Sequence, residues 1–375
     1  MPAEPRKPVI ALLLPNLAGG GAERANLYLA QEFLARGYEV DLVLMQRKGE
    51  LLPLLPARVQ VIDLATQQIR KLLRPLTAYI QQRQPDAVLA TMWPLTSMAV
   101  LCHKLARLQG RLVVAEQNVL SPQYAEWGHL HNLLLRTSIA STYPWADARI
   151  GVSEGVVDDL AALSGIKKAR FEVVYNPVPR PEPASNTALA QAEQCWGKRR
   201  GPRILTVGSL KAQKNQALLI RAFAQAFAQS NADLLILGEG QLRHDLEALA
   251  AQEGVSNKVH LPGFFSDPTP FYQTADLFVL SSDYEGLPTV LIEALACGLP
   301  VVATQCPAGP AEILDNGRWG CLVPVGNVAA LAAAMLKALS RPHDREALQR
   351  RAATFSPSTA ANRYLELLFP GTRVR

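Results

Sequence analysis

The sequence lacks the patterns that mark several classes of protein. Its five cysteines are scattered and include no Cys-x-x-Cys pair, so we expect reduced thiols in the cytoplasm and no zinc site or disulfide framework. No apolar run approaches the roughly eighteen residues that cross a bilayer. The dinucleotide fingerprint Gly-x-Gly-x-x-Gly is missing, which weighs against a nicotinamide oxidoreductase.

What the chain does have is a globular composition with a basic surplus. With 375 residues, 49% of them hydrophobic and 19% charged, it is long enough for two domains of ordinary size. The formal charge of +6 favours anionic partners such as sugar nucleotides or acidic membrane surfaces. Because the basic residues are dispersed and not interleaved with aromatic residues, we expect no nucleic-acid partner.

Two stretches alternate between strand-like and helix-like runs, and a proline-rich segment separates them. Continuous apolar strands are typical of parallel sheets covered on both faces, so each stretch predicts a doubly wound α/β unit with ligand loops after its strands. The segment 178–202 is predicted to be a linker with a helical patch near 187–196. The predicted strands are 9–14, 39–45, 59–64, 86–91, 111–116, 148–153, 171–175, 203–208, 233–237, 258–261, 276–280 and 301–304. The predicted helices include 22–36, 66–83, 95–107, 215–229, 241–252, 327–340 and 357–369.

The run from 280 to 304 is the most informative part of the sequence. A helix of about ten residues is predicted between Pro288, which suits a first turn, and Gly298, which with the following Pro300 ends it. Apolar residues recur within it at helical spacing and predict its buried face. These residues are Val290, Leu291, Ala294 and Leu295.

Two glutamates bracket the start of this helix. Glu285 lies in the loop before it, and Glu293 lies along it with seven residues between them. The backbone N–H groups of Gly286, Leu287 and Thr289 are expected at the positive end of the helix dipole, where a phosphate binds well. The spacing therefore predicts an anion site between two carboxylates. A surface helix with one capping and one solvated glutamate explains the same spacing.

These residues resemble a known family. The segment EGLPTVLIE, from Glu285 to Glu293, is similar to the E-x7-E motif of the family 4 retaining glycosyltransferases, which have the GT-B fold. Further segments match the family in the expected order, so the resemblance covers almost the whole chain. They are GGGAER at 19–24, GVSEGV at 151–156, YNP at 175–177, VGSLKAQKN at 207–215, GEG at 238–240 and GPAEIL at 309–314.

The resemblance implies an architecture and an activity. Two Rossmann-like domains would face a central cleft, with 1–177 binding the acceptor, 203–355 binding the nucleotide sugar, and the C-terminal helix 356–369 packing back on the first domain. The implied reaction moves a hexose or N-acetylhexosamine from a nucleotide diphosphate sugar, UDP-linked on the hint of GPAEIL, to a glycan or glycolipid acceptor. Such products belong to the biosynthesis of cell-surface polysaccharide, lipopolysaccharide or lipid-linked oligosaccharide.

The same resemblance implies roles for individual residues. Glu285 would accept hydrogen bonds from the donor sugar and Lys214 would contact the diphosphate, which makes these two the catalytic candidates. Glu293 would bind the ribose hydroxyls, because a carboxylate offers two acceptor oxygens to a diol. The remaining expected site residues are Gly20, Gly21, Ser209, Gly238, Glu239, Gly240, Gly286, Leu287, Pro288 and Thr289 on the donor side, and Arg24, Gln117 and Asn118 on the acceptor side.

The sequence departs from the family pattern at two places. Ser209 stands where an Arg is usual, and a hydroxyl brings neither charge nor a bidentate fork, so Lys211 or Arg24 is a candidate to supply the missing charge. Gln117 or Asn118 stands where relatives often carry a His. Because neither can act as a general base, we expect the leaving phosphate to help take the acceptor proton.

The chain also contains no Asp-x-Asp pair, with which many transferases hold a metal beside the diphosphate. Side chains and helix dipoles would then meet the developing charge, so we predict that no metal or other cofactor is required. Two competing interpretations keep the same fold: a sugar-nucleotide epimerase, and a non-catalytic sugar-nucleotide-binding protein, for which Ser209 and Gln117 give some support.

We expect a cytoplasmic protein, with peripheral contact at the inner membrane face as a further expectation. The apolar run 9–14 is too short for a signal sequence, and a buried first strand explains it. The predicted helix 66–83 can contact a membrane or pack on its own sheet. An aromatic-rich stretch fits acceptor contact, membrane contact or packing; it contains Tyr124, Trp127, His129, His131, Tyr143 and Trp145.

Overall fold

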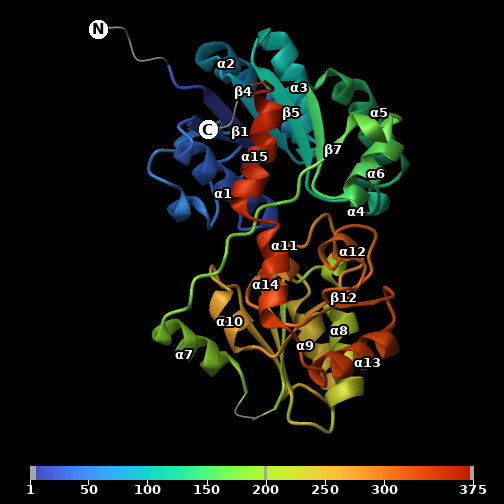
Figure 1. Cartoon of the computed structure of the whole chain (residues 1–375). Helices are drawn as coiled ribbons and strands as arrows, with labels where there is room; N and C mark the ends of the chain where they lie inside the picture. The colour runs from blue at the N-terminus through green and yellow to red at the C-terminus, as the bar shows by residue number, and fades with distance from the viewer. Residues whose placement is uncertain (1–5, 198–200, 372–375) are drawn as a thin grey trace. The chain divides into compact units, whose positions relative to one another are not determined.

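The computed structural model describes residues 6–197 and 201–371, which form two compact units. One unit contains the residues up to Pro177 together with those from Ser356 onwards, and the other is Val178–Phe355. Each is built on one parallel sheet with helices around it (Figure 1). The prediction of two doubly wound α/β domains is therefore confirmed.

The first unit has a seven-stranded sheet in the order β3-β2-β1-β4-β5-β6-β7. Every residue of β1 is buried, as expected for a strand covered on both faces. The strands are Val9–Leu14 (β1), Glu39–Leu44 (β2), Gln60–Asp63 (β3), Ala87–Thr91 (β4), Arg111–Glu116 (β5), Ala148–Gly151 (β6) and Glu172–Val173 (β7). The helices are Gly21–Ala35 (α1), Leu73–Arg83 (α2), Leu95–Ala106 (α3), Leu120–Gln123 (α4), His129–Thr142 (α5) and Glu154–Ser164 (α6), with 3-10 turns at Leu52–Leu54 (η1), Ile69–Lys71 (η2), Ala125–Trp127 (η3), Tyr143–Trp145 (η4) and Lys168–Arg170 (η5).

The second unit has a six-stranded sheet in the order β10-β9-β8-β11-β12-β13. Its strands are Arg203–Val207 (β8), Asp233–Leu237 (β9), Val259–Gly263 (β10), Leu277–Leu280 (β11), Val301–Thr304 (β12) and Cys321–Val323 (β13). Its helices are Asn186–Cys195 (α7), Gln216–Phe227 (α8), Arg243–Gln252 (α9), Thr269–Thr274 (α10), Thr289–Ala296 (α11), Pro310–Ile313 (α12), Val328–Leu339 (α13) and Arg345–Ala353 (α14), with a 3-10 turn at Ala212–Lys214 (η6).

Both sheets reverse their strand order next to their first strand. In the first unit β1 lies between β2 and β4, and in the second unit β8 lies between β9 and β11. At such a reversal the loops leaving neighbouring strands run to opposite faces and open a crevice, which is where doubly wound proteins bind ligands. The loops after β8 and β11 are therefore the first place to look for a site.

Several elements differ from the prediction. The predicted helix 66–83 begins only at Leu73, because Pro75 fits no position later than the first turn. Its apolar residues Leu72, Leu76 and Ile80 are buried, whereas Ile69 and Leu73 are half-buried. Packing therefore explains most of this apolar face, and membrane contact by the helix stays a prediction. Strand β13 and helices α5, α10 and α14 were not predicted. β13 has only three residues, too few to show a periodic pattern.

The predicted linker 178–202 is not a free linker. Its described residues belong to the second unit and include α7, whose first turn is capped by the Ser185 side chain. Trp196 is buried, and its Nε1 donates to the Thr274 Oγ1 of α10 at 3.0 Å. The prolines therefore shape a segment that packs on the second unit, and residues 198–200 lie outside the described chain.

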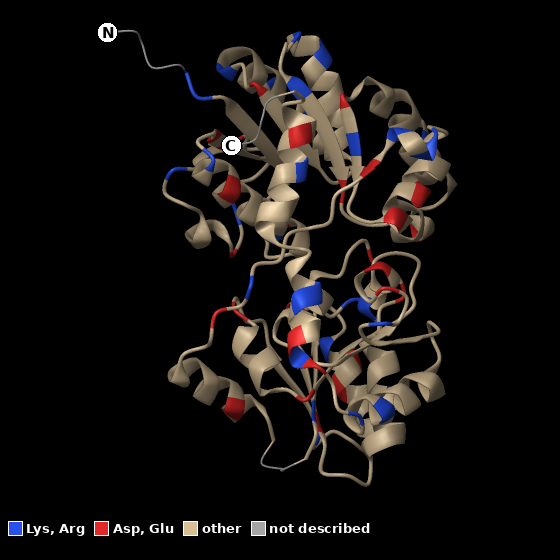
Figure 2. Ribbon diagram, viewed as in Figure 1, with Lys and Arg blue, Asp and Glu red and all other residues tan. Residues whose placement is uncertain are grey.

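Charged residues of both signs are interspersed along the elements of each unit (Figure 2). Among residues 6–197 and 201–371, no helix is long and apolar enough to span a membrane.

The last helix of the chain completes the core of the first unit. Helix α15 (Pro357–Leu368) lies beside α1, and its Tyr364, Leu365 and Leu368 are buried in the same cluster as the strands of that sheet (Figure 1). Arg111 on β5 also donates its Nε to the backbone oxygen of Leu367 at 3.1 Å. The first unit is thus built from two stretches of chain that lie far apart in sequence.

We expect Leu368→Ala to lower the free energy of unfolding of the first unit by about 2–5 kcal/mol, because it leaves a cavity at a fully buried position. Urea titration measures the change. The exposed Leu336 is the matched control, and Leu336→Ala should stay within about 0.5 kcal/mol of the parent protein. Equal effects of the two variants would contradict the role given to α15.

Candidate active site

Lys214 and Glu285 meet at the reversal point of the second sheet. Lys214 ends the turn η6 after β8, Glu285 lies in the loop after β11, and these two strands are paired neighbours. Lys214 Nζ lies 2.6 Å from Glu285 Oε1, and the two side chains are only 17% and 7% exposed. The strand order therefore joins two catalytic candidates that are 71 residues apart in sequence.

Hydroxyl groups hold both partners of this ion pair in place. Ser282 Oγ donates to the same Glu285 Oε1 at 2.6 Å, and Thr304 Oγ1 donates to the backbone oxygen of Ser282 at 2.5 Å. Ser281 Oγ donates to the backbone oxygen of Lys214 at 2.9 Å. The carboxylate is buried, but it accepts hydrogen bonds and faces a cation, as a buried charge requires.

A second set of contacts ties the two loops together. Asn215 takes the left-handed conformation at φ 43°, and its Oδ1 caps α8 by accepting from Leu218 N. Its Nδ2 donates to Asp283 Oδ1 at 2.8 Å, and Gln213 Nε2 donates to the backbone oxygen of Tyr284 at 2.9 Å. The geometry is therefore fixed by the two neighbours of Lys214 and by the two residues that precede Glu285.

The loop between Glu285 and α11 is buried. Gly286, Leu287 and Pro288 are all shielded from solvent, and α11 starts one residue later than predicted, at Thr289. No residue in the described ranges accepts a hydrogen bond from the N–H of Gly286 or Leu287. These two donors, beside the positive end of α11, can serve an anionic ligand.

The GPAEIL segment covers this loop and requires a glycine. Gly309 has φ +91°, and a Cβ there would lie 2.5 Å from Pro288 Cδ and 2.9 Å from the backbone oxygen of Gly286. Only glycine permits both this conformation and this approach.

Glu293 lies half-buried on α11, and its Oε2 accepts from the hydroxyl of the buried Tyr272 at 3.0 Å.

Two cysteines lie close to Glu285 and Glu293. Burial, with Glu293 nearby, raises the pKa of Cys297 to about 12, and burial, with Glu285 nearby, does the same for Cys306. Both thiols are therefore protonated at neutral pH and cannot act as nucleophiles.

The GEG segment has a structural reason for its two glycines. Gly238 has φ +145°, and a Cβ there would lie 2.1 Å from the backbone oxygen of Gly208. A Cβ on Gly240 would lie 2.3 Å from the backbone oxygen of Leu210. Close contact between the loops after β8 and β9 therefore explains both glycines, without reference to a ligand. Their predicted role in nucleotide binding stays a prediction.

Other predicted donor residues lie on the surface of the second unit. The Glu239 carboxylate is paired with Arg243, which holds the pKa of Glu239 below its ordinary value. Ser209 is exposed in the loop after β8, where its backbone oxygen accepts from Gln216 Nε2 at 3.0 Å, and Lys211 is exposed two residues later. That Lys211 replaces the missing arginine stays a prediction.

The remaining predicted residues belong to the first unit. Gly20 and Gly21 are the N-cap and first residue of α1, and Arg24 is half-buried on the same helix. Gln117 and Asn118 follow β5 directly, and Gln117 Oε1 accepts from Asn176 Nδ2 at 2.7 Å. They thus follow the carboxyl ends of β1 and β5, where ligand loops are expected in this unit.

Glu116, which the sequence analysis did not single out, is fully buried at the end of β5. Its carboxyl group accepts from Thr96 Oγ1 at 2.8 Å, from the Tyr143 hydroxyl, and from the backbone N–H of Trp93 at 2.9 Å. Burial raises the pKa of Glu116 to about 7. The sequence signal that could have indicated this buried carboxyl group is a charged residue at the end of the apolar strand RLVVAE. Through these hydrogen bonds Glu116, the residue immediately before Gln117, connects the loop after β4 to the turn η4.

This raised pKa predicts a pH dependence of stability. The folded chain binds the Glu116 proton more tightly than the unfolded chain, so the stabilisation is complete below about pH 4.5 and is lost as the pH rises through about 7. We expect the difference in unfolding free energy between the parent protein and Glu116→Gln to fall by about 3 kcal/mol over this interval. Urea titrations at several pH values measure it. The exposed Glu126→Gln is the control, and a constant difference for Glu116→Gln would contradict the prediction.

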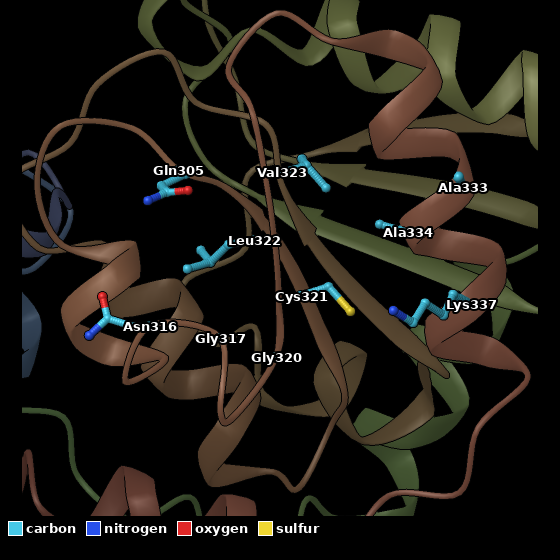
Figure 3. Close-up of a pocket in the computed structure, with 10 residues that line it drawn as sticks. All are labelled: Gln305, Asn316, Gly317, Gly320, Cys321, Leu322, Val323, Ala333, Ala334 and Lys337. Carbon is cyan, nitrogen blue, oxygen red and sulfur yellow. The ribbon is translucent and has the colours of Figure 1, made fainter.

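A separate pocket lies at the β13 edge of the second sheet (Figure 3). It has a volume of about 590 Å³ and includes none of the predicted site residues. Strand β12 separates β13 from β11, so this pocket is not at the reversal point. Its lining consists of Gln305, Asn316, Gly317, Gly320, Cys321, Leu322, Val323, Ala333, Ala334 and Lys337.

Comparison with known proteins identifies the family. The sequence profile described as Glycosyltransferase Family 4 matches residues 19–180, and the profile described as Glycosyl transferases group 1 matches residues 194–355. The chain belongs to the family 4 glycosyltransferases. The two matches fall on the two α/β units, and the parallel-sheet architecture of this glycosyltransferase is the GT-B fold of its structural neighbours.

Similar proteins include enzymes of glycan assembly. The glycosyltransferase is 28% identical, over 92% of its length and 94% of the relative's, to the N-acetylgalactosamine-N,N'-diacetylbacillosaminyl-diphospho-undecaprenol 4-alpha-N-acetylgalactosaminyltransferase of Campylobacter jejuni. It is 32% identical, over 44% of its length and 49% of the relative's, to the lipopolysaccharide core biosynthesis glycosyltransferase LpsE of Rhizobium meliloti. Among solved structures, Anabaena HepE in complex with UDP-glucose has a TM-score of 0.82 at 22% identity and covers 96% of this chain and 99% of its own.

Proposed function

We propose that this glycosyltransferase moves a hexose or N-acetylhexosamine from a UDP-sugar to a lipid-linked or lipopolysaccharide glycan and retains the anomeric configuration of the donor. The observation that carries the donor site is the buried Lys214–Glu285 pair at the reversal point of the second sheet. The Campylobacter relative is named for an undecaprenol-linked acceptor, and HepE was solved with UDP-glucose, which supports this choice of acceptor and donor. We place the reaction in the cytoplasm, at the inner face of the membrane.

In the proposed complex the donor diphosphate binds where Lys214 meets the start of α11. The Lys214 ammonium has three donor positions, so it can bind a phosphate oxygen while it keeps its contact with Glu285. The N–H groups of Gly286 and Leu287 supply further donors near the positive end of the helix. Positive charge is thus positioned before the leaving group becomes negative.

The two carboxylates orient the rest of the donor. Glu285 accepts hydrogen bonds from hydroxyls of the transferred sugar. Glu293 accepts from the ribose hydroxyls, while the Tyr272 hydroxyl donates to its Oε2. Pro288 and Thr289 line the sugar and phosphates through the backbone. We assign Gly20 and Gly21, at the start of α1 in the first unit, to the donor side, and Arg24, Gln117 and Asn118 to the acceptor side.

The transfer itself replaces one bond to the anomeric carbon by another on the same face. The bond from this carbon to the diphosphate oxygen breaks, the acceptor oxygen bonds to the carbon, and the acceptor proton passes to the leaving phosphate oxygen. This route suits the site because neither Gln117 nor Asn118 can take a proton. We further propose that Lys214 and the helix dipole replace a metal ion in balancing the charge.

We expect Lys214→Ala and Glu285→Ala each to lower kcat by about 100-fold to 1000-fold, since each removes a preorganised polar contact to the reacting donor. Transfer of labelled sugar measures kcat, and NMR of the product gives its anomeric configuration. Either substitution leaves the other charge buried without its partner, so thermal melting must show that the variant is folded.

The exposed Lys337→Ala is the matched control and should keep kcat within about twofold of the parent enzyme. Turnover of Lys214→Ala within a few-fold of the parent would remove Lys214 from the site. An inverted product would refute retention. A new sugar nucleotide formed without acceptor would instead support an epimerase, and donor binding with no product would support a non-catalytic binding protein.

Metal independence is tested by chelation. With saturating EDTA we expect the transfer rate to change by less than about twofold, because the Lys214 ammonium and the α11 dipole already supply the positive charge. Added magnesium or manganese should restore nothing further. Loss of transfer in EDTA that magnesium or manganese reverses would overturn this part of the proposal.

A further inference from the structure

Exposed apolar side chains are concentrated in one part of the first unit. Of the eleven large apolar side chains that are exposed among residues 6–197 and 201–371, seven lie between positions 101 and 145. Single exposed leucines are ordinary on a protein surface, but a local concentration of this kind marks an interaction site. These residues are Leu101, Leu105, Trp127, Leu130, Leu133, Leu134 and Trp145.

Helix α5 carries the densest part of this set. One of its faces is buried in the unit through Leu135, Ile139 and Thr142. The face that we call the α5 face consists of Leu130, Leu133 and Leu134, which are 75%, 58% and 58% exposed, with Trp127 just before the helix at 55%. The helix is therefore apolar on both sides, although it has only one side to pack against its own protein.

The polar residues that continue the α5 face have their hydroxyls satisfied by the helix itself. Thr137 Oγ1 donates to the backbone oxygen of Leu133 at 2.8 Å, and Ser141 Oγ donates to that of Thr137 at 2.7 Å. Hydroxyls that donate to the helix backbone in this way do not need water as a hydrogen-bond acceptor. The face can therefore enter an apolar medium at small cost.

Aromatic and basic groups border the α5 face. Trp127 packs edge-on against Tyr124 at 4.7 Å and against His131 at 5.6 Å between ring centroids. Turn η4 contacts both α5 and α3, and its exposed Trp145 has Lys104 Nζ 2.9 Å from its ring centroid. Tryptophan and basic side chains beside exposed leucines are typical of protein surfaces that lie in the headgroup region of a bilayer.

We propose that the α5 face docks this glycosyltransferase on a membrane containing anionic lipids, with its leucines in the acyl boundary and Trp127 at headgroup level. Helix α5 contains Arg136 and no acidic residue, and Lys104 and Arg107 are exposed on or beside α3. The exposed Glu126 lies beside Trp127, but the three basic residues outnumber it, and anionic headgroups complement the resulting positive charge. The inference rests on the proposed lipid-linked acceptor for its purpose, but membrane binding is measured without donor or acceptor.

Vesicle flotation tests the docking surface. The full chain should bind phosphatidylcholine vesicles containing phosphatidylglycerol, and Leu130→Gln/Leu133→Gln/Leu134→Gln should lower the partition coefficient by about tenfold or more. A matched triple variant at three exposed apolar positions elsewhere, Leu54→Gln/Val325→Gln/Leu336→Gln, should bind like the parent protein. Because all six side chains are exposed, both variants should keep the parent melting temperature.

Two further measurements identify the contact. Brominated lipids should quench the parent protein and Trp319→Phe, but should quench Trp127→Phe much less. Arg136→Gln should weaken binding about fivefold on anionic vesicles and hardly at all on pure phosphatidylcholine.

Equal binding of the two triple variants, or no binding by the parent protein, would overturn the proposal. So would a parent dimer in sedimentation that the α5 triple variant converts to monomer, which would assign the face to self-association. If the α5 variant loses vesicle binding but still transfers sugar to a detergent-dispersed acceptor, docking and catalysis are separate. Loss of transfer with normal vesicle binding in Lys214→Ala concerns only the proposed function.

Discussion

The reversal of strand order in the second sheet is the constraint on which the proposed site depends. Strands β8 and β11 are neighbours although 69 residues lie between Val207 and Leu277. Their carboxyl ends therefore deliver two unrelated loops to one place, and these loops contribute Lys214 and Glu285. Neither residue could occupy so buried a position alone, since an uncompensated charge there would cost several kcal/mol. Each buried charge therefore requires the other as its partner.

The surroundings of this ion pair favour a rigid site. Hydroxyl groups of Ser281, Ser282 and Thr304 hold its backbone and carboxylate, and the conformations of Gly238 and Gly309 allow neighbouring loops to approach within van der Waals contact. Groups held by such contacts need little reorganisation to stabilise the negative charge that develops in the proposed reaction. The structure thus shows a packing role for the glycines of these motifs.

The sequence was sufficient to predict the two α/β units and the neighbourhood of Glu285, because apolar strands and a helix start with Pro288 are local patterns. It could not distinguish the exposed face of a helix from the buried one. Leu72, Leu76 and Ile80 of 66–83 were considered for membrane contact and are buried, whereas α5 was not predicted and carries exposed leucines. Glu116 was missed because its importance comes from Tyr143 and Thr96, which only the fold brings to it. The composition of 178–202 indicated a linker, although Trp196 anchors that segment by a contact that no local pattern reveals.

Helix α15 also constrains the order of events when the chain is made. The first unit begins with β1 but needs Tyr364, Leu365 and Leu368 to complete its core, while Val178–Phe355 is continuous in sequence. A ribosome therefore releases every residue of the second unit before the first can close. The second unit emerges as one continuous segment, whereas the apolar cluster of the first stays incomplete until α15 has also emerged. Of the two units, the one whose synthesis starts earlier is therefore the one whose core is completed later.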